Sequence, residues 1–171
     1  NNLQKICYTN MQERAQGGLL EPQTYSISGS DLVALMEAVL AKNGTFRFTA
    51  SGSSMAPFIQ TGDMVTISSL HKGRVGLGTV VAFKHPVGGH LVIHRVVGVA
   101  HGTFLIKGDN TPHRSDGWIP SGCLIGRVLE ITRNGRRVWL GLGVERYLIA
   151  FFSRWQWLIP LRGALAALRR R

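Results

Sequence analysis

A short segment rich in glycine and serine presents the hydroxyl that is best placed to do chemistry. It reads Ser51-Gly52-Ser53-Ser54-Met55-Ala56-Pro57. Gly52 lets the backbone approach a ligand closely, while Met55 and Pro57 give Ser54 an apolar anchor and a rigid exit. A serine hydroxyl is a weak nucleophile unless a neighbouring base takes its proton. Ser54 is therefore a candidate nucleophile, and the alternative is an ordinary turn serine.

The base that Ser54 would need is His94, in the otherwise apolar run Leu91-Val92-Ile93-His94-Arg95-Val96-Val97. An imidazole has a free pKa of about 6.5, so it can accept a serine proton near neutral pH. Strand alternation would place His94 and Arg95 on opposite faces. The alternative is a histidine with a structural role. The other histidines lie on predicted loops without metal-binding spacing, so we expect no metal and no cofactor.

A third residue would be needed to orient the imidazole, and two aspartates could supply it. Asp109 lies in the run Lys107-Gly108-Asp109-Asn110, and Asp116 follows seven residues later. A carboxylate beside a catalytic histidine fixes its tautomer and stabilises the imidazolium. We favour Asp109 because it follows directly on a predicted strand, and Asp116 is the alternative. Without catalysis, the same run would be a simple Gly-Asp-Asn turn.

The elements that must position these residues are mostly strands. Apolar periodicity predicts a helix over 31–42, and strands over 46–49, 63–69, 79–84, 90–98, 103–107, 123–131 and 136–140. Gly88-Gly89 and Asn134-Gly135 are typical of tight hairpins. Several short strands at close spacing predict a compact antiparallel β domain. We expect a mostly β fold with one N-terminal helix and a C-terminal helical tail.

The chain of 171 residues divides by composition into three parts. Residues 1–27 are expected to be a flexible leader, 28–143 the catalytic domain, and 144–171 a basic amphipathic tail split by Pro160. The net charge of +11 is concentrated near the C-terminus, because residues 127–171 hold ten arginines against two glutamates. Arginine mixed with aromatic residues suits an anionic membrane surface. Cys7 and Cys123 form no disulfide or zinc pattern.

Membrane insertion and secretion are not expected from the sequence. The first 30 residues lack the apolar stretch of a signal peptide. Arginines interrupt the apolar C-terminal region well before the roughly 20 residues that a membrane span requires. We therefore expect a location at a membrane periphery or in the cytoplasm.

The motifs SGSSMAP, TGD, VIHRVVG and KGDN-x5-D occur in this order over about residues 45–130. Together they resemble the signal peptidase I superfamily, in particular its Ser–His branch of endoplasmic reticulum and archaeal type. The same superfamily includes the self-cleaving SOS-type repressors. The resemblance implies a serine endopeptidase with Ser54 as nucleophile, His94 as base, and Asp109 or Asp116 as third member. It also implies a peptide or preprotein substrate bound as an extended strand and cut after a small residue.

The resemblance leaves the oxyanion site and the exact function open. Gly52 stands where bacterial signal peptidases often have a serine, so the oxyanion would bind the Ser54 N–H, helped by the Ser53 hydroxyl. A repressor-type autoprotease that binds DNA is the first alternative. The single helix predicted before residue 45 and the absence of any Ala-Gly or Cys-Gly bond count against it. We therefore do not expect nucleic acid as a partner. The second alternative is a non-catalytic module that binds membrane surfaces.

Overall fold

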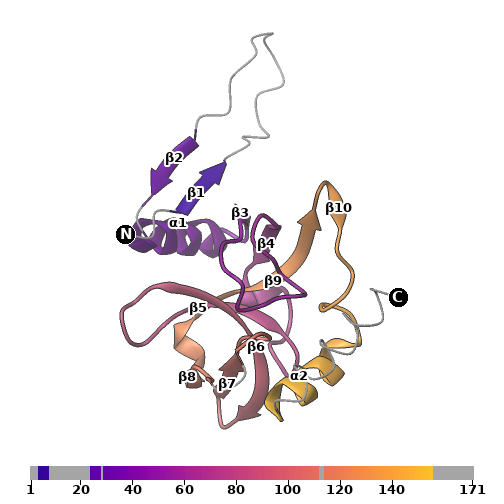
Figure 1. Ribbon diagram of the computed structural model, residues 1–171. Coiled ribbons are helices and arrows are strands. Elements are labelled where there is room, and N and C mark those ends of the chain that lie inside the picture. The colour runs from indigo at the N-terminus through magenta and orange to yellow at the C-terminus, as the bar shows by residue number, and fades with distance from the viewer. Residues whose placement is uncertain (1–3, 8–23, 28, 112–113, 156–171) are drawn as a thin grey trace, which may run out of the picture.

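Eight antiparallel strands form the sheet that carries the candidate residues (Figure 1). The computed structural model describes residues 4–7, 24–27, 29–111 and 114–155. The strand order is β3-β4-β9-β5-β6-β7-β8, and β10 pairs with β9. The strands are β3 (Thr45–Thr49), β4 (Met64–Ser68), β5 (Val80–Lys84), β6 (Leu91–Ala100), β7 (Thr103–Lys107), β8 (Gly117–Pro120), β9 (Leu124–Arg133) and β10 (Arg136–Arg137).

Two buried apolar clusters pack on the strands, and β5 contributes to both. Val80 and Ala82 belong to a first cluster with residues of α1, β3, β4 and β9, where α1 is the helix Gly29–Ala41. Val81 and Phe83 belong to a second cluster with residues of β6, β7, β8 and the start of β9. Successive side chains of a strand point to opposite faces. The unbroken apolar run of β5 is therefore explained by burial on both sides.

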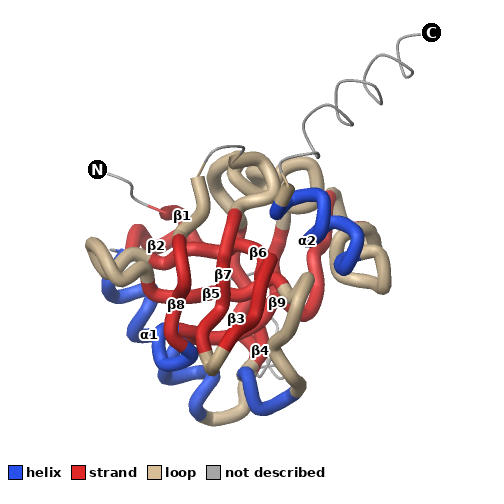
Figure 2. Tube along the Cα trace, turned by 90° about the horizontal axis from the view of Figure 1, so that it is seen from below, coloured by secondary structure: helices blue, strands red, loops and turns tan. Residues whose placement is uncertain are grey.

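Two helices flank the strands, and Figures 1 and 2 show them on opposite sides of the domain. Helix α1 buries Leu32, Met36 and Leu40, which recur every four residues along one face. Helix α2 spans Arg146–Arg154 and packs against β6. Two short 3₁₀ turns, η1 (Leu70–Lys72) and η2 (Ser121–Cys123), complete the connections.

The expected fold class is confirmed: the chain is mostly antiparallel β with one N-terminal and one C-terminal helix. Both predicted hairpins form. Gly88 and Gly89 have positive φ angles between β5 and β6, and Asn134 and Gly135 have them between β9 and β10. Strand β8 was not predicted, because its four residues Gly117–Pro120 are too few to show a period.

Two short segments of the expected leader over residues 1–27 form strands. Strands β1 (Gln4–Cys7) and β2 (Thr24–Ile27) pair as a separate antiparallel sheet. Cross-strand hydrogen bonds can order short segments that lack a long periodic pattern. The rest of the leader lies outside the described residues, as does the tail from residue 156, including Pro160. Among the described helices, none is both long and apolar enough to cross a membrane.

Candidate active site

Ser54 lies in the turn that connects β3 and β4, and hydrogen bonds within the turn stabilise its conformation. The N–H of Gly52 donates to Thr61 Oγ1 at 3.1 Å, and the Thr61 hydroxyl donates to the Gly52 carbonyl at 3.0 Å. The turn also buries Met55, whose carbonyl accepts the N–H of Ile59 at 3.0 Å. Gly52 has a φ of 99°, a conformation that favours glycine. The serine is therefore presented on a braced turn.

His94 faces Ser54 from the middle of β6. Its Nε2 lies 2.9 Å from Ser54 Oγ, and its Nδ1 lies 2.6 Å from Asp116 Oδ2. An ionised carboxylate only accepts hydrogen bonds, so Nδ1 carries the proton that is donated to Asp116. In the neutral imidazole, Nε2 then has a free lone pair and accepts the Ser54 hydroxyl proton. The three side chains form a continuous relay from hydroxyl to imidazole to carboxylate.

The structure differs from our preference for Asp109 as the partner of His94. Asp109 is buried and binds Arg95, whereas Asp116 contacts the imidazole. The physical reason is the path of the chain after β7. Residue 109 turns inward beneath the loop, and the chain returns as the Asp116 N–H donates to the Ile106 carbonyl at 2.9 Å. This bond brings residue 116 back beside the end of β7, and so beside His94.

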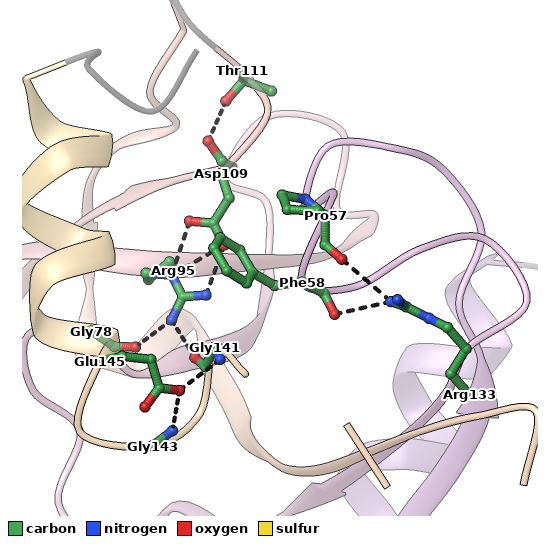
Figure 3. Close-up of polar contacts among 11 residues, drawn as sticks. Pro57, Phe58, Gly78, Arg95, Asp109, Thr111, Arg133, Gly141, Gly143 and Glu145 are labelled. Atoms are coloured by element: carbon green, nitrogen blue, oxygen red, sulfur yellow. Dashed lines mark hydrogen bonds and ion pairs between the residues drawn. The ribbon is translucent and has the colours of Figure 1, made fainter. Parts of the chain in front are cut away.

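Arg95, the residue after His94 on β6, is held by a network of polar contacts (Figure 3). Its Nε and Nη2 donate to the two carboxylate oxygens of Asp109 at 2.9 and 2.7 Å. Its Nη1 donates to the carbonyls of Gly78 at 2.9 Å and Gly141 at 2.7 Å, and the guanidinium lies over the Phe58 ring. Both charged side chains have no exposed surface. Burial raises the pKa of Asp109, although Arg95 opposes this effect.

Two residues that contact Ser54 and its turn were not identified as functional from the sequence. The backbone N–H of Asn110 donates to the Ser54 carbonyl at 2.7 Å, and its Nδ2 donates to the Ser53 carbonyl at 3.0 Å. Gly108 passes so close that an added Cβ would lie 2.8 Å from the Ser54 carbonyl oxygen and 3.0 Å from His94 Nε2. The Gly-Asp-Asn turn was the available signal for both residues.

A cleft of about 310 Å³ opens beside Ser54 and His94. Its wall mixes polar and apolar groups and comes from the end of β3, the turn that carries Ser54 and the first half of β6. Its apolar lining includes Phe48, Met55, Ile59, Leu91 and Ile93. An extended peptide running between these elements would bring a carbonyl carbon to Ser54 Oγ and an apolar side chain into the cleft.

Other predicted features of the site remain as predictions. One of them is the oxyanion site at the Ser54 N–H and the Ser53 hydroxyl. Among residues 29–111 and 114–155, no group of three histidine, cysteine, aspartate or glutamate side chains could hold a metal ion.

Comparison with known proteins agrees with the geometry. No curated protein matches the chain. The family model described as Peptidase S24-like matches residues 10–120, which include Ser54, His94 and Asp116. This match confirms the superfamily resemblance and leaves the branch unresolved. The family model covers more than half of the chain, and within the matched region a serine, an imidazole and a carboxylate lie in line on an antiparallel sheet. The chain therefore belongs to the Peptidase S24-like family of serine peptidases.

Proposed function

We propose that the protein is an endopeptidase in which Ser54, His94 and Asp116 form the catalytic triad. The observation that carries the proposal is the unbroken pair of short contacts, 2.9 Å from hydroxyl to imidazole and 2.6 Å from imidazole to carboxylate. These distances lie within the range at which a base takes a proton from a nucleophile. The proposed reaction draws on these side chains and on water, without a cofactor.

The proposed reaction follows from the roles of the three groups. Ser54 Oγ attacks the peptide carbonyl carbon as its proton moves to His94 Nε2, giving a tetrahedral oxyanion. The C–N bond then breaks, the imidazolium gives its proton to the leaving amine, and an acyl-serine ester remains. A water molecule then attacks the acyl-serine ester, with His94 again as base. This step releases the acid product and free Ser54. Asp116 remains ionised and stabilises the imidazolium.

The proposed oxyanion site lies at the start of the serine turn. The Ser54 N–H, helped by the Ser53 hydroxyl, would donate to the developing negative charge. The carbonyls of both residues are held by Asn110, so the direction of their peptide groups is fixed before substrate binds. Donors that need no reorganisation in the transition state account for much of the catalysis in such sites.

We further propose a leader or signal-type peptide, bound as an extended strand, as the substrate. The cleft lies between β3 and β6, where edge pairing could align the peptide main chain with Ser54. Its volume of about 310 Å³ has room for the side chain at the scissile position, which we propose to be small because the superfamily resemblance implies it. The histidine base favours the Ser–His branch of the superfamily over the repressor branch, where a lysine takes this role.

The test is cleavage of a peptide library by the full chain, with products identified by mass spectrometry. Ser54→Ala should abolish cleavage, and Ser121→Ala, a serine substitution outside the site, should leave it unchanged. Retained cleavage by Ser54→Ala would reject the proposal.

Incubation of the protein alone, over a range of concentrations, separates action on other chains from repressor-like self-cleavage. Intramolecular cleavage has a rate constant independent of concentration. If the chain cut only itself in this manner and no added peptide, the proposed leader or signal-type substrate would be wrong.

A further inference from the structure

Helix α2 is apolar on two opposite sides, and only one of them is covered. Its inner side buries Ile149, Ala150 and Ser153 against the domain. At about 100° per residue, three exposed side chains of the helix fall within roughly 100° on the other side, together with Val144 just before the helix and Trp155 just after it. This outer face consists of Val144 (85% exposed), Tyr147 (47%), Leu148 (63%), Phe151 (54%) and Trp155 (61%).

The outer face is held in a fixed direction because α2 is anchored through its inner side. Lys107 Nζ, itself buried, donates to the Ser153 carbonyl at 2.8 Å. Arg154 Nη1 donates to the Val97 carbonyl at 3.4 Å. Near its start, the helix backbone approaches the chain before β5 so closely that a Cβ at Gly78 would lie 2.7 Å from the Arg146 carbonyl oxygen. A rigid helix therefore presents a row of large apolar groups to the surroundings.

Two positive charges lie on the helix that carries the outer face. They belong to Arg146 and Arg154. The carboxylate of Glu145, which directly precedes the helix, is already engaged. It accepts the N–H groups of Gly141 and Gly143. A surface that complements this region therefore has an apolar interior, which takes up the outer face, and negative groups at its edge, which meet the arginines.

We propose that the outer face of α2 docks the protein on an anionic lipid bilayer, with the helix lying in the plane of the interface. Leu148 and Phe151 would enter the acyl-chain boundary, and Tyr147 and Trp155 are suited to the headgroup level. The Arg146 guanidinium already lies over the Tyr147 ring at 4.9 Å and donates to its hydroxyl, which places positive charge at the edge of the face.

A second copy of the chain fits this face less well than a bilayer does. Self-association through α2 would bring two arginine-rich surfaces together, and each chain carries a net charge of +11. Like charges facing each other at an interface are costly. A bilayer containing anionic lipids instead attracts the arginines near its surface. This docking does not depend on the proposed cleavage reaction.

The experiment measures binding of the full chain to vesicles by flotation, using phosphatidylcholine alone or phosphatidylcholine with phosphatidylglycerol. We expect binding to the anionic vesicles, weakened by added salt. Leu148→Asp and Phe151→Asp should each weaken it at least about tenfold, since each removes a large apolar group that would enter the bilayer. Leu129→Asp, which changes an exposed leucine on β9, should bind like the wild type.

Circular dichroism and thermal unfolding establish that each variant is folded, which is expected because the substituted side chains are exposed. The proposal would be overturned if the wild type failed to bind anionic vesicles, or if both α2 variants bound as the wild type does. In the latter case, binding would come from the arginines alone. It would also be overturned if light scattering showed a wild-type dimer that Leu148→Asp dissociates, because a second copy would then cover the face.

Discussion

The two sides of strand β6 at positions 94 and 95 use an aspartate in opposite ways. On the cleft side, His94 meets Asp116, and both side chains keep some exposure, 11% and 16%. On the inner side, Arg95 meets Asp109 with no exposure at all. Adjacent residues thus each contact an aspartate. The two contacts differ in the basic group, an imidazole or a guanidinium, and in their access to water. In the proposed reaction, the accessible pair exchanges protons with a substrate, whereas the buried pair has a structural role.

A single loop supplies the aspartates on both sides of the strand. The loop after β7 supplies Asp109 to the inner side and Asp116 to the cleft side, and between them Asn110 holds the serine turn. A permanently charged guanidinium cannot act as a base, whereas an imidazole changes its charge near neutral pH. Substitutions on the two sides should therefore separate activity from stability.

The largest effect on activity short of removing Ser54 or His94 is expected from Asp116→Asn. An amide at this position would favour the wrong tautomer of His94, so kcat/KM should fall by about 10⁴-fold. The unfolding temperature should stay close to that of the wild type, because Asp116 is partly exposed. Kinetics on the best library peptide, together with calorimetry, measure both. An equal loss of stability would show that the two sides are not separate.

Asp109→Asn should have the larger effect on stability. It leaves the buried Arg95 charge without its partner, a change that typically costs about 3–5 kcal/mol. Denaturant unfolding at neutral pH measures the free energy. Combining Asp109→Leu with Arg95→Met should cost less than the sum of the two single changes, because no unpaired charge remains. Strict additivity would contradict the assignment of these residues as a coupled pair.

Gly108→Ala tests the contact between the loop and the two reacting side chains. The added methyl group would push against the Ser54 carbonyl and His94 Nε2. A displacement of about 1 Å at such a site can lower kcat/KM by about a hundredfold. Gly122→Ala is the matched control, since an added Cβ there meets nothing within 4 Å. Unchanged activity of Gly108→Ala would show that the approach of the loop has no influence on catalysis.

The smallest effect is expected at a third aspartate, Asp63, which pairs with the partly exposed Arg133. Burial tends to raise the pKa of Asp63, but hydrogen bonds from Arg133 and from the Gln60 N–H outweigh it and hold the pKa below 3.8. A lowered folded-state pKa gives stability that is present above about pH 3.8 and is lost as the pH falls through the folded-state value.

Asp63→Asn should therefore cost about 1–2 kcal/mol at pH 7, and the difference from the wild type should shrink as the pH falls below 3.8. Urea unfolding at several pH values measures this. A difference that stays constant down to acid would contradict the sign of the shift.

The sequence was sufficient for the parts of the fold that rest on local periodicity. Strands β3 to β7 and β9, helix α1 and the two hairpins follow from alternation and from glycine or asparagine at turns. The pairing of β1 with β2 and the short strand β8 depend on cross-strand hydrogen bonds that leave little local pattern. The pairing of β1 with β2 could not be predicted because the two strands are distant in the chain. Strand β8 could not be predicted because it has too few residues to show a period.

The candidate site shows the same limit. Ser54 and His94 were singled out because their residue types and surroundings suit a nucleophile and a base, and the structure brings them together. The choice between Asp109 and Asp116 could not be made from spacing, because it depends on how the loop after β7 folds back. Arg95 carried the missing information: a buried arginine beside His94 requires a carboxylate of its own.

The central claim is that His94 activates Ser54, and labelling with a fluorophosphonate tests it most directly. The reagent phosphonylates a serine only when the hydroxyl is nucleophilic, releasing fluoride. We predict one adduct by intact mass, mapped to Ser54, that is lost in Ser54→Ala and at least about a thousandfold slower in His94→Ala. Labelling of Ser54 at the wild-type rate in folded His94→Ala, or no labelling of the wild type, would contradict the claim.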